Sequence, residues 1–194
     1  MTLGYFMRLI LASQSPRRLE LLARLGVVPD AVIPADIDEA VLKGELPIPY
    51  ARRVAAAKAA AVAKPGALTL AADVVVAAGR RILPKAETEA EGRFCLELLS
   101  GRRHRVHCAV TLVDGEGKAR HRLSSSIVTF KRLSDEEIRA YLAGGEWRGK
   151  AGGYAIQGRA EALIRAIGGS YSGIMGLPVF ETRALLRAAG YPLG

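Results

Sequence analysis

The sequence predicts a mixed sheet in an α/β or α+β protein. Short apolar runs, typical of buried strands, alternate along the chain with segments whose apolar residues recur every three to four positions, as in amphipathic helices. The pair Asp114-Gly115 separates two strand-like segments and predicts an antiparallel hairpin between them. Because a hairpin interrupts an otherwise alternating order of strands and helices, the sheet is expected to contain both parallel and antiparallel pairs.

The first half of the chain opens with a strand, Leu9–Ala12, that leads directly into a helix over Pro16–Leu25. Ser15 is suited to the N-cap of this helix and Pro16 to its first position, and Gly26 marks its end. The other elements expected here are an extended acidic segment over Val27–Ala40, a helix over Pro49–Ala63, a strand over Leu68–Ala78 and a short strand at Ile82-Leu83.

The second half begins with a helix over Glu87–Leu99, which is followed by the two strands of the hairpin. Ser134 and Glu137 form a capping-box pattern that opens a further helix, ending near Ala143. The remaining segments are the hairpin strands His104–Val113 and Ala119–Phe130, a loop over Gly144–Gly153, the segment Arg159–Ile167 with helical propensity, and a last helix over Pro178–Ala189.

Composition limits the classes of partner. The net charge of +9 favours acidic ligands such as nucleic acid, anionic lipid or a polyphosphate, but the basic residues are scattered, which makes nucleic acid an unlikely partner. No apolar stretch reaches the ~18 residues of a membrane span, so we expect no membrane association. Cys95 and Cys108 form no CxxC motif, and we expect them to be reduced thiols of a cytoplasmic protein.

The junction between the first strand and the first helix predicts a phosphate site. Ser13, Arg17 and Arg18 stand where the strand ends and the helix begins. Hydroxyl groups, free backbone N–H groups and guanidinium groups together bind phosphate well. A capped strand–helix junction with two solvated arginines is the simpler alternative at this stage.

Asp73 is the sharpest single signal in the sequence, because it lies within a nearly continuous apolar strand. Asp is depleted in strands, and a buried carboxylate is costly unless it is paired or binds a metal. Asp73 is therefore a candidate general base or cation ligand. The alternative is a structural Asp at the end of a strand, bonded to the backbone or to an Arg.

Other polar residues are weaker candidates. Asp38-Glu39 could join Asp73 in holding a hard divalent cation, Lys58 and Lys85 could face a polyphosphate, and Gln157 could read a base edge from a glycine-rich loop. Each could equally be solvated. Together with Asp73 they fit metal-assisted attack of water on a phosphoanhydride.

In order along the chain, these segments resemble the Maf family of nucleoside triphosphate pyrophosphatases. The resemblance extends from residue 9 to residue 178 and is most specific at Ser15-Pro16-Arg17-Arg18 and Tyr154-Ala155-Ile156-Gln157-Gly158. The other matching stretches are Leu11-Ala12-Ser13-Gln14, Asp38-Glu39, Lys58, Ala72-Asp73, Leu99-Ser100-Gly101 with His104-Arg105-Val106, Gly169-Ser170-Tyr171 and Gly176-Leu177-Pro178.

The resemblance implies an α/β fold of two lobes, in which helices flank a long mixed sheet with a central cleft, as in inosine triphosphatases. Residues 1–194 would form a single such domain, usually as a homodimer, in the cytoplasm. The enzyme would convert a nucleoside triphosphate to the monophosphate and pyrophosphate with Mg²⁺ or Mn²⁺. Asp73 would be the proton acceptor, Glu39 and Asp73 would hold the cation, and the triphosphate path would comprise Ser13, Arg17, Arg18, Lys58 and Lys85. It also makes Arg159–Ile167 partly strand, and we adopt that expectation.

The family pattern also distinguishes two branches. At positions 17 and 157 the sequence resembles the branch that hydrolyses dTTP and UTP, because it has Arg17 and Gln157. The 7-methyl-GTP branch tends to have Trp and Glu at these positions. Modified pyrimidine nucleotides could also be accepted. Val74 replaces the usual Thr after the catalytic Asp, so it is the third specificity position. The alternatives are a 7-methyl-GTP pyrophosphatase and a non-enzymatic, nucleotide-binding regulator of septum formation.

Overall fold

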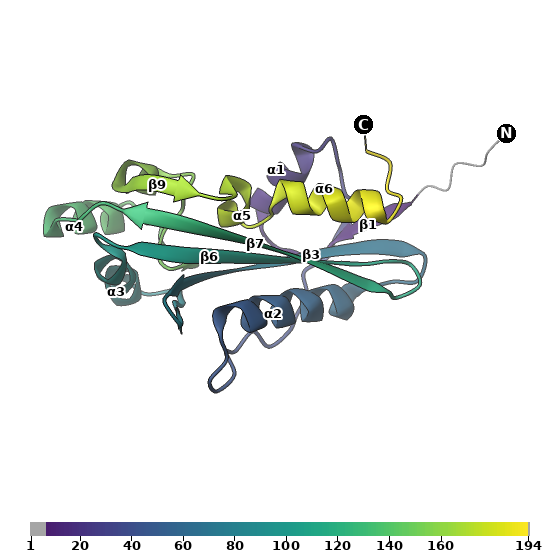
Figure 1. Ribbon diagram of the computed structural model, residues 1–194, viewed down its shortest axis with the longest axis horizontal. Coiled ribbons are helices and arrows are strands. Elements are labelled where there is room, and N and C mark those ends of the chain that lie inside the picture. The colour runs from purple at the N-terminus through teal and green to yellow at the C-terminus, as the bar shows by residue number, and fades with distance from the viewer. Residues whose placement is uncertain (1–6, 194) are drawn as a thin grey trace.

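The computed structural model describes residues 7–193, and residues 1–6 and 194 of the predicted domain lie outside it. A long mixed sheet runs through the molecule (Figure 1). Strand β1 pairs in parallel with β2 and β3, and the other pairs of this sheet are antiparallel. The strand order is β2 (Ala31–Val32), β1 (Arg8–Leu11), β3 (Ala67–Ala78), β6 (Arg103–Val113), β7 (Ala119–Phe130) and β9 (Ile164–Gly168), and β4 (Arg81–Ile82) pairs with the end of β3. The predicted mixed α/β class is confirmed.

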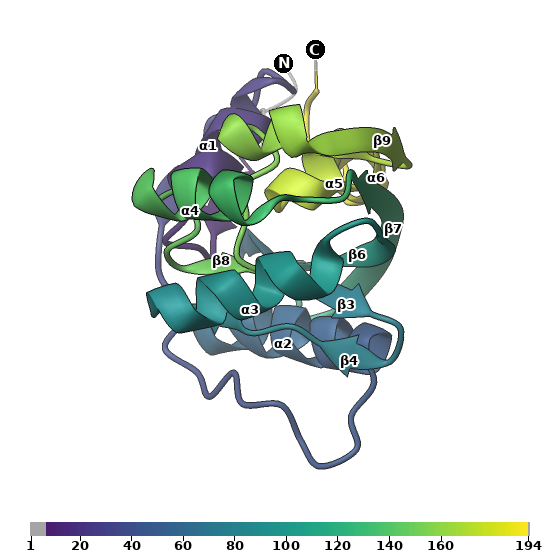
Figure 2. The ribbon, with the colours of Figure 1, turned by 90° about the vertical axis from the view of Figure 1, so that its left-hand side faces the viewer.

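Helices cover both faces of the sheet (Figures 1 and 2). Helix α2 (Pro47–Val62) packs on one face, against β3 and β6. The opposite face carries α1 (Pro16–Ala23), α5 (Tyr171–Met175) and α6 (Val179–Ala188), while α3 (Glu89–Leu99) and α4 (Asp135–Ala143) lie together toward one end. None of these helices combines the length and apolar character that a membrane span requires in residues 7–193.

The central strand β3 is buried on both faces because it lies between these helix layers. Ten of its twelve residues are buried, which explains why its sequence is an almost continuous apolar run rather than an alternating one. Leu70 and Leu68 join the larger core on the side of α1 and α6, whereas Val75 packs with Tyr50 and Val54 of α2. A polar residue in β3 is therefore buried wherever it points.

The predicted hairpin is confirmed between β6 and β7. Asp114 organises the turn, because its Oδ1 accepts hydrogen bonds from the N–H groups of Glu116 and Lys118 at 3.2 and 2.9 Å. The glycine with positive φ is Gly117, at +87°, rather than Gly115. Gly115 instead packs closely on the backbone of Gly66, where a side chain would clash.

Most element positions agree with the predictions, and the differences fall in short segments. The helix predicted to start at Pro49 begins at Pro47, since both prolines fit its first turn. Within the predicted loop Gly144–Gly153, β8 (Lys150–Ala151) pairs with β5 (Lys85–Ala86) as a small second sheet.

Two further differences lie near the C-terminal end. The segment Arg159–Ile167 is a 3₁₀ turn, η1 (Arg159–Leu163), followed by β9, so the helix favoured by propensity is wrong and the family expectation is confirmed. The glycine-rich stretch around Tyr171 contains the short helix α5, whose N-cap Ser170 accepts a hydrogen bond from the Gly173 N–H.

Gly152, next to β8, should be hard to replace. Its φ is +69°, and a Cβ would lie 2.7 Å from Val76 Cγ1, whereas Gly149 has a similar φ of +65° and open space around it. Gly152→Ala should therefore lower the free energy of unfolding by about 1–3 kcal/mol more than Gly149→Ala, which suffers backbone strain alone. Chemical denaturation of both variants measures this. Equal losses would contradict the proposed contact with Val76.

Candidate active site

A cavity of about 740 Å³ opens where the β1–α1 junction, α2, β3, the small β5–β8 sheet and the glycine-rich loop meet. All the side chains that the family resemblance assigns to the site line it. They are Ser13, Arg17, Arg18, Glu39, Lys58, Asp73, Val74, Lys85 and Gln157. The other cation candidate, Asp38, is exposed outside the cavity and accepts a hydrogen bond from the Ala40 N–H at 2.8 Å. The structure thus brings together residues that lie up to 144 positions apart in the chain.

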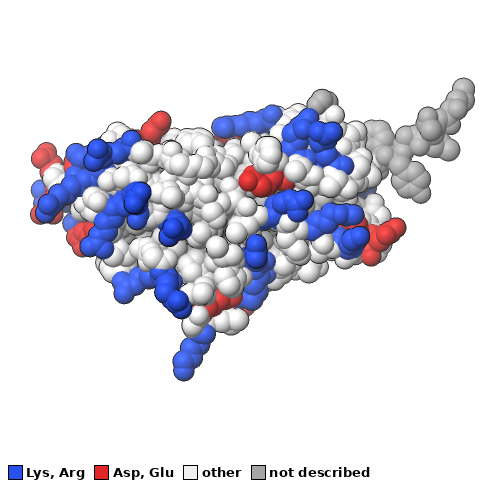
Figure 3. Space-filling model, viewed as in Figure 1, with Lys and Arg blue, Asp and Glu red and all other residues white. Residues whose placement is uncertain are grey.

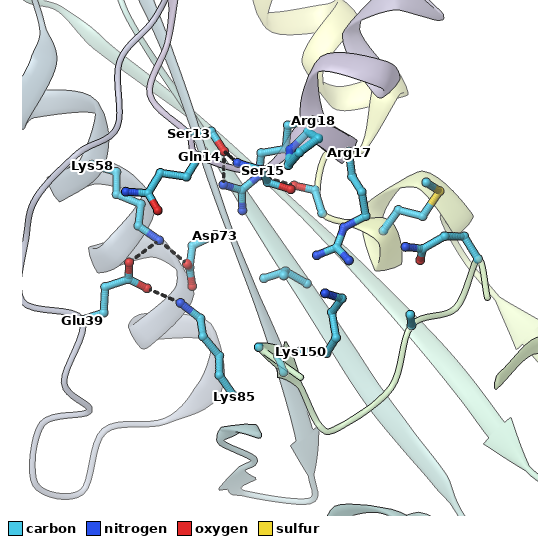
Figure 4. A pocket seen from close by; sticks show the side chains of 18 of the residues that line it. Ser13, Gln14, Ser15, Arg17, Arg18, Glu39, Lys58, Asp73, Lys85 and Lys150 are labelled. Atoms are coloured by element: carbon cyan, nitrogen blue, oxygen red, sulfur yellow. Dashed lines mark hydrogen bonds and ion pairs between the residues drawn. The ribbon is translucent and has the colours of Figure 1, made fainter. Parts of the chain in front are cut away.

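A network of four charged side chains occupies one end of this cavity (Figure 4). The Lys58 ammonium lies 2.9 Å from Asp73 Oδ1 and 2.9 Å from Glu39 Oε1. The other oxygen of Glu39, Oε2, accepts a hydrogen bond from Lys85 Nζ at 2.8 Å. Two ammonium groups and two carboxylates therefore balance one another.

Burial explains why Asp73 and Lys58 must pair. Asp73 is only 3% exposed in the middle of β3, opposite Ala109 of β6, and Lys58 is 7% exposed on the face of α2 that covers this strand. An unpaired charge at either position would cost several kcal/mol. The alanines around Lys58 leave room for its side chain to reach the strand.

The two carboxylates differ in environment. Burial raises the pKa of Asp73, and the Lys58 ammonium only partly offsets this. Burial also acts to raise the pKa of Glu39, but hydrogen bonds from Lys85 and Lys58 outweigh it and leave the pKa below its usual value. Glu39 is therefore the firmly ionised member, and Asp73 is the one whose affinity for a proton is increased.

The β1–α1 junction is built around Ser13. Its Oγ accepts hydrogen bonds from the Ser15 N–H at 3.1 Å and from Arg18 Nη1 at 2.9 Å, and Arg18 Nε donates to the Gly176 carbonyl at 2.9 Å. Arg18 thus fixes two loops in addition to lining the cavity. The first turn of α1 has no acidic residue and no side-chain cap. Pro16 has no N–H and the Arg18 N–H donates to the Ser15 carbonyl at 3.1 Å, so the Arg17 N–H is the one that this turn offers to an anion.

Arg17 and Lys150 point toward one another at the other end of the cavity (Figure 4). Burial lowers the pKa of Arg17, and the neighbouring Arg18 adds to this; burial, followed by the charge of Arg17, lowers the pKa of Lys150. In the part of the chain that the structure describes, neither cation forms a salt bridge with a carboxylate. This end of the cavity therefore carries two cations without a direct ion pair, and the acidic residue whose charge favours the charged form of Lys150 is Glu87.

The sequence reasoning missed Lys150, which was assigned to a loop. Its only signal was its position two residues before Gly152-Gly153, ahead of the glycine-rich loop that carries Gln157. It also missed Glu146, which lines the cavity and accepts a hydrogen bond from the Arg159 N–H at 2.8 Å.

Glu39 and Asp73 are suitable ligands for a hard divalent cation. Their oxygens converge on the Lys58 ammonium, so this position already favours positive charge. Residues 7–193 contain no group of three or more His, Cys, Asp or Glu side chains arranged for metal binding. The pair of carboxylates is the donor set expected where Mg²⁺ is held by one or two carboxylates and its coordination is completed by water and substrate phosphates.

Known proteins are similar to this chain over most of its length. Residues 8–189 match the family model described as Maf-like protein. A dTTP/UTP pyrophosphatase of Novosphingobium aromaticivorans is 62% identical over 94% of this chain and 92% of that protein, and one of Rhodospirillum rubrum is 61% identical over 96% and 90%.

Among solved structures, a HAM1 protein from Coxiella burnetii has a TM-score of 0.52 and 18% identity, covering 94% of this chain and all of that one. This likeness concerns the fold, a long mixed sheet flanked by helices. The family match extends over nearly the whole chain, and the sequence identities to the curated relatives exceed one half. The chain therefore belongs to the Maf family.

Proposed function

We propose that the protein hydrolyses dTTP and UTP to the nucleoside monophosphate and pyrophosphate, with Mg²⁺ or Mn²⁺ as cofactor. The observation that carries this proposal is the Asp73 carboxylate, buried in β3, held by Lys58 and directed at a cavity rich in cationic side chains. The curated relatives at 55–62% identity are named dTTP/UTP pyrophosphatases, which supports the choice of substrate.

In the proposed reaction, Asp73 takes a proton from a water molecule whose oxygen bonds to the α-phosphorus. The bond from that phosphorus to its bridging oxygen breaks, and the electron pair leaves with pyrophosphate. The hydrogen bonds of Asp73 suit this role, because Lys58 occupies Oδ1 and no hydrogen bond to Oδ2 occurs in the described residues. The raised pKa of Asp73 makes it a better proton acceptor than an exposed Asp.

The remaining residues would bind the triphosphate and orient it. Ser13 and the first turn of α1 would face the phosphates, and Arg17, Arg18, Lys58 and Lys85 would balance the charge that builds up on the leaving pyrophosphate. Glu39 and Asp73 would hold the divalent cation, which supplies further positive charge at the phosphate oxygens. Arg17, Val74 and Gln157 line the part of the cavity proposed to select the base.

The proposal also includes a cytoplasmic homodimer without nucleic acid as a partner. The buried free thiols of Cys95 and Cys108 fit a reducing compartment. On the face shown in Figure 3, Lys and Arg are spread among neutral and acidic residues rather than gathered in one stripe, which disfavours a nucleic-acid track.

A substrate panel tests the proposed activity. With Mg²⁺, pyrophosphate release should be faster for dTTP and UTP than for ATP, GTP and 7-methyl-GTP, because Arg17 and Gln157 suit a neutral pyrimidine edge. Chelating the cation with EDTA should abolish release, and restoring Mg²⁺ should recover it. A preference for 7-methyl-GTP would overturn the assignment to pyrimidines, and nucleotide binding without hydrolysis would favour a regulator.

Replacing Asp73, the proposed general base, should nearly abolish turnover. Asp73→Asn keeps the size of the side chain and removes its ability to accept the proton, so kcat for UTP should fall about 10²–10⁴-fold. Asp135→Asn, at an exposed position in the first turn of α4, is the matched control and should retain wild-type kcat. An Asp73→Asn protein that is folded by circular dichroism and as fast as wild type would refute the role of Asp73.

The pH dependence of kcat/KM should report the ionisation of Asp73. Asp73 can accept a proton only in its ionised form. The value of kcat/KM should therefore fall as pH drops through a pKa above the usual Asp value of about 4. Lys58→Met removes the cation that favours the ionised form, so the acidic limb of the profile should move to higher pH. In Lys118→Met, at the distant hairpin, the limb should stay in place. An unmoved limb in Lys58→Met would show that Lys58 does not tune the base.

A further inference from the structure

We propose that Lys150 reads the base of the substrate by donating a hydrogen bond to the 4-keto oxygen of uracil or thymine. This inference rests on the proposed function and adds to it a residue that selects keto over amino pyrimidines. It begins from the position of Lys150, which lies on β8 and directs its ammonium into the cavity opposite Arg17 (Figure 4).

The cavity has two chemically different ends. The end at Asp73 carries the groups suited to phosphate and cation, namely Ser13, Lys58, Lys85 and Glu39. The other end continues into a recess of about 40 Å³, and none of those four residues lines it. Lys150, like Arg17, lines both the main cavity and this recess, so it lies where the phosphate end passes into the recess.

The recess, together with the adjoining end of the main cavity, has the composition of a site for a flat ring. Its walls are mostly apolar, and three polar side chains, Arg17, Lys150 and Gln157, stand at it. Apolar walls with a few placed polar groups are typical of sites that bind an aromatic ligand and fix its orientation. The apolar lining consists of Val74, Val76, Ala151, Tyr154, Ala155, Ile156, Ile174 and Met175.

The three polar groups match one pyrimidine edge. Uracil and thymine present an acceptor, a donor and an acceptor in sequence, at O2, N3–H and O4. Arg17 and Lys150 can only donate, whereas the amide of Gln157 can accept from N3–H. Cytosine presents an amino group in place of O4, and an ammonium cannot accept a hydrogen bond from it.

The ammonium of Lys150 is free to make this contact. Its one hydrogen bond in the described residues goes to the Arg148 carbonyl, at 3.2 Å, so two of its three N–H donors remain available. Its surroundings also disfavour the charged form, because burial and then the charge of Arg17, which lies opposite, lower the pKa of Lys150. A carbonyl oxygen with partial negative charge would accept a hydrogen bond from one of the unused donors and would stabilise the positive charge.

Steady-state kinetics of Lys150→Met with UTP and CTP test the proposal. The variant keeps the length of the side chain and loses its donor, so kcat/KM for UTP should fall about 10- to 100-fold, while that for CTP should change little. Lys118→Met, at the distant hairpin, is the matched control and should leave both values unchanged. An equal fall for UTP and CTP would overturn the proposal and assign Lys150 to the triphosphate.

A second variant keeps the test decisive if Lys150→Met folds poorly. Lys150→Gln places an amide that both donates and accepts, so CTP should gain relative to UTP. An unchanged UTP-to-CTP ratio in this variant would contradict the base contact. If the wild-type protein hydrolyses neither nucleotide, the proposed function itself fails, which is a separate outcome from failure of the role of Lys150.

Discussion

The site depends on one buried ammonium, that of Lys58, which both Asp73 and Glu39 share at 2.9 Å. A carboxylate in the middle of a strand that is covered on both faces would otherwise be protonated or would destabilise the fold. Helix α2 supplies the compensating charge from the opposite layer, so the packing of this helix on β3 also favours the ionised form of Asp73. Fold and chemistry are thus coupled at a single contact between two layers.

The charge pattern divides the cavity into two ends with different tasks. At the Asp73 end, the charges of the four networked side chains cancel, so the negative charge of the substrate phosphates would be offset by Arg18 and a divalent cation. At the Arg17–Lys150 end, two cations form no salt bridge in the described residues, and most of the recess wall is apolar. Such an end suits a ring whose rim carries partly negative keto oxygens. Strand β3 fixes the positions of the two ends relative to one another, because Asp73 of one end and Val74 of the other are consecutive residues of this strand.

Much of this arrangement could be predicted from the sequence, since strong local patterns carried it. The apolar run around Asp73, the Ser15-Pro16 helix start and the Asp114 hairpin each follow from the chemistry of a few adjacent residues. The small β5–β8 sheet and Lys150 could not be found this way, because two-residue strands have no periodicity and their pairing joins segments about 65 residues apart. The contact of Lys58 with two carboxylates likewise depends on tertiary packing. Propensity failed at Arg159–Ile167, where pairing with β7 outweighs local helical preference.

The central claim is that Lys58 sets the ionisation of the buried Asp73, and ¹³C NMR of the Asp73 carboxyl group tests it most directly. The account predicts a titration with a midpoint above the usual Asp value in the wild-type protein, and a midpoint at still higher pH in Lys58→Met, because the compensating cation is gone. A carboxyl group that titrates like an exposed Asp, or one whose midpoint does not respond to the loss of Lys58, would contradict it.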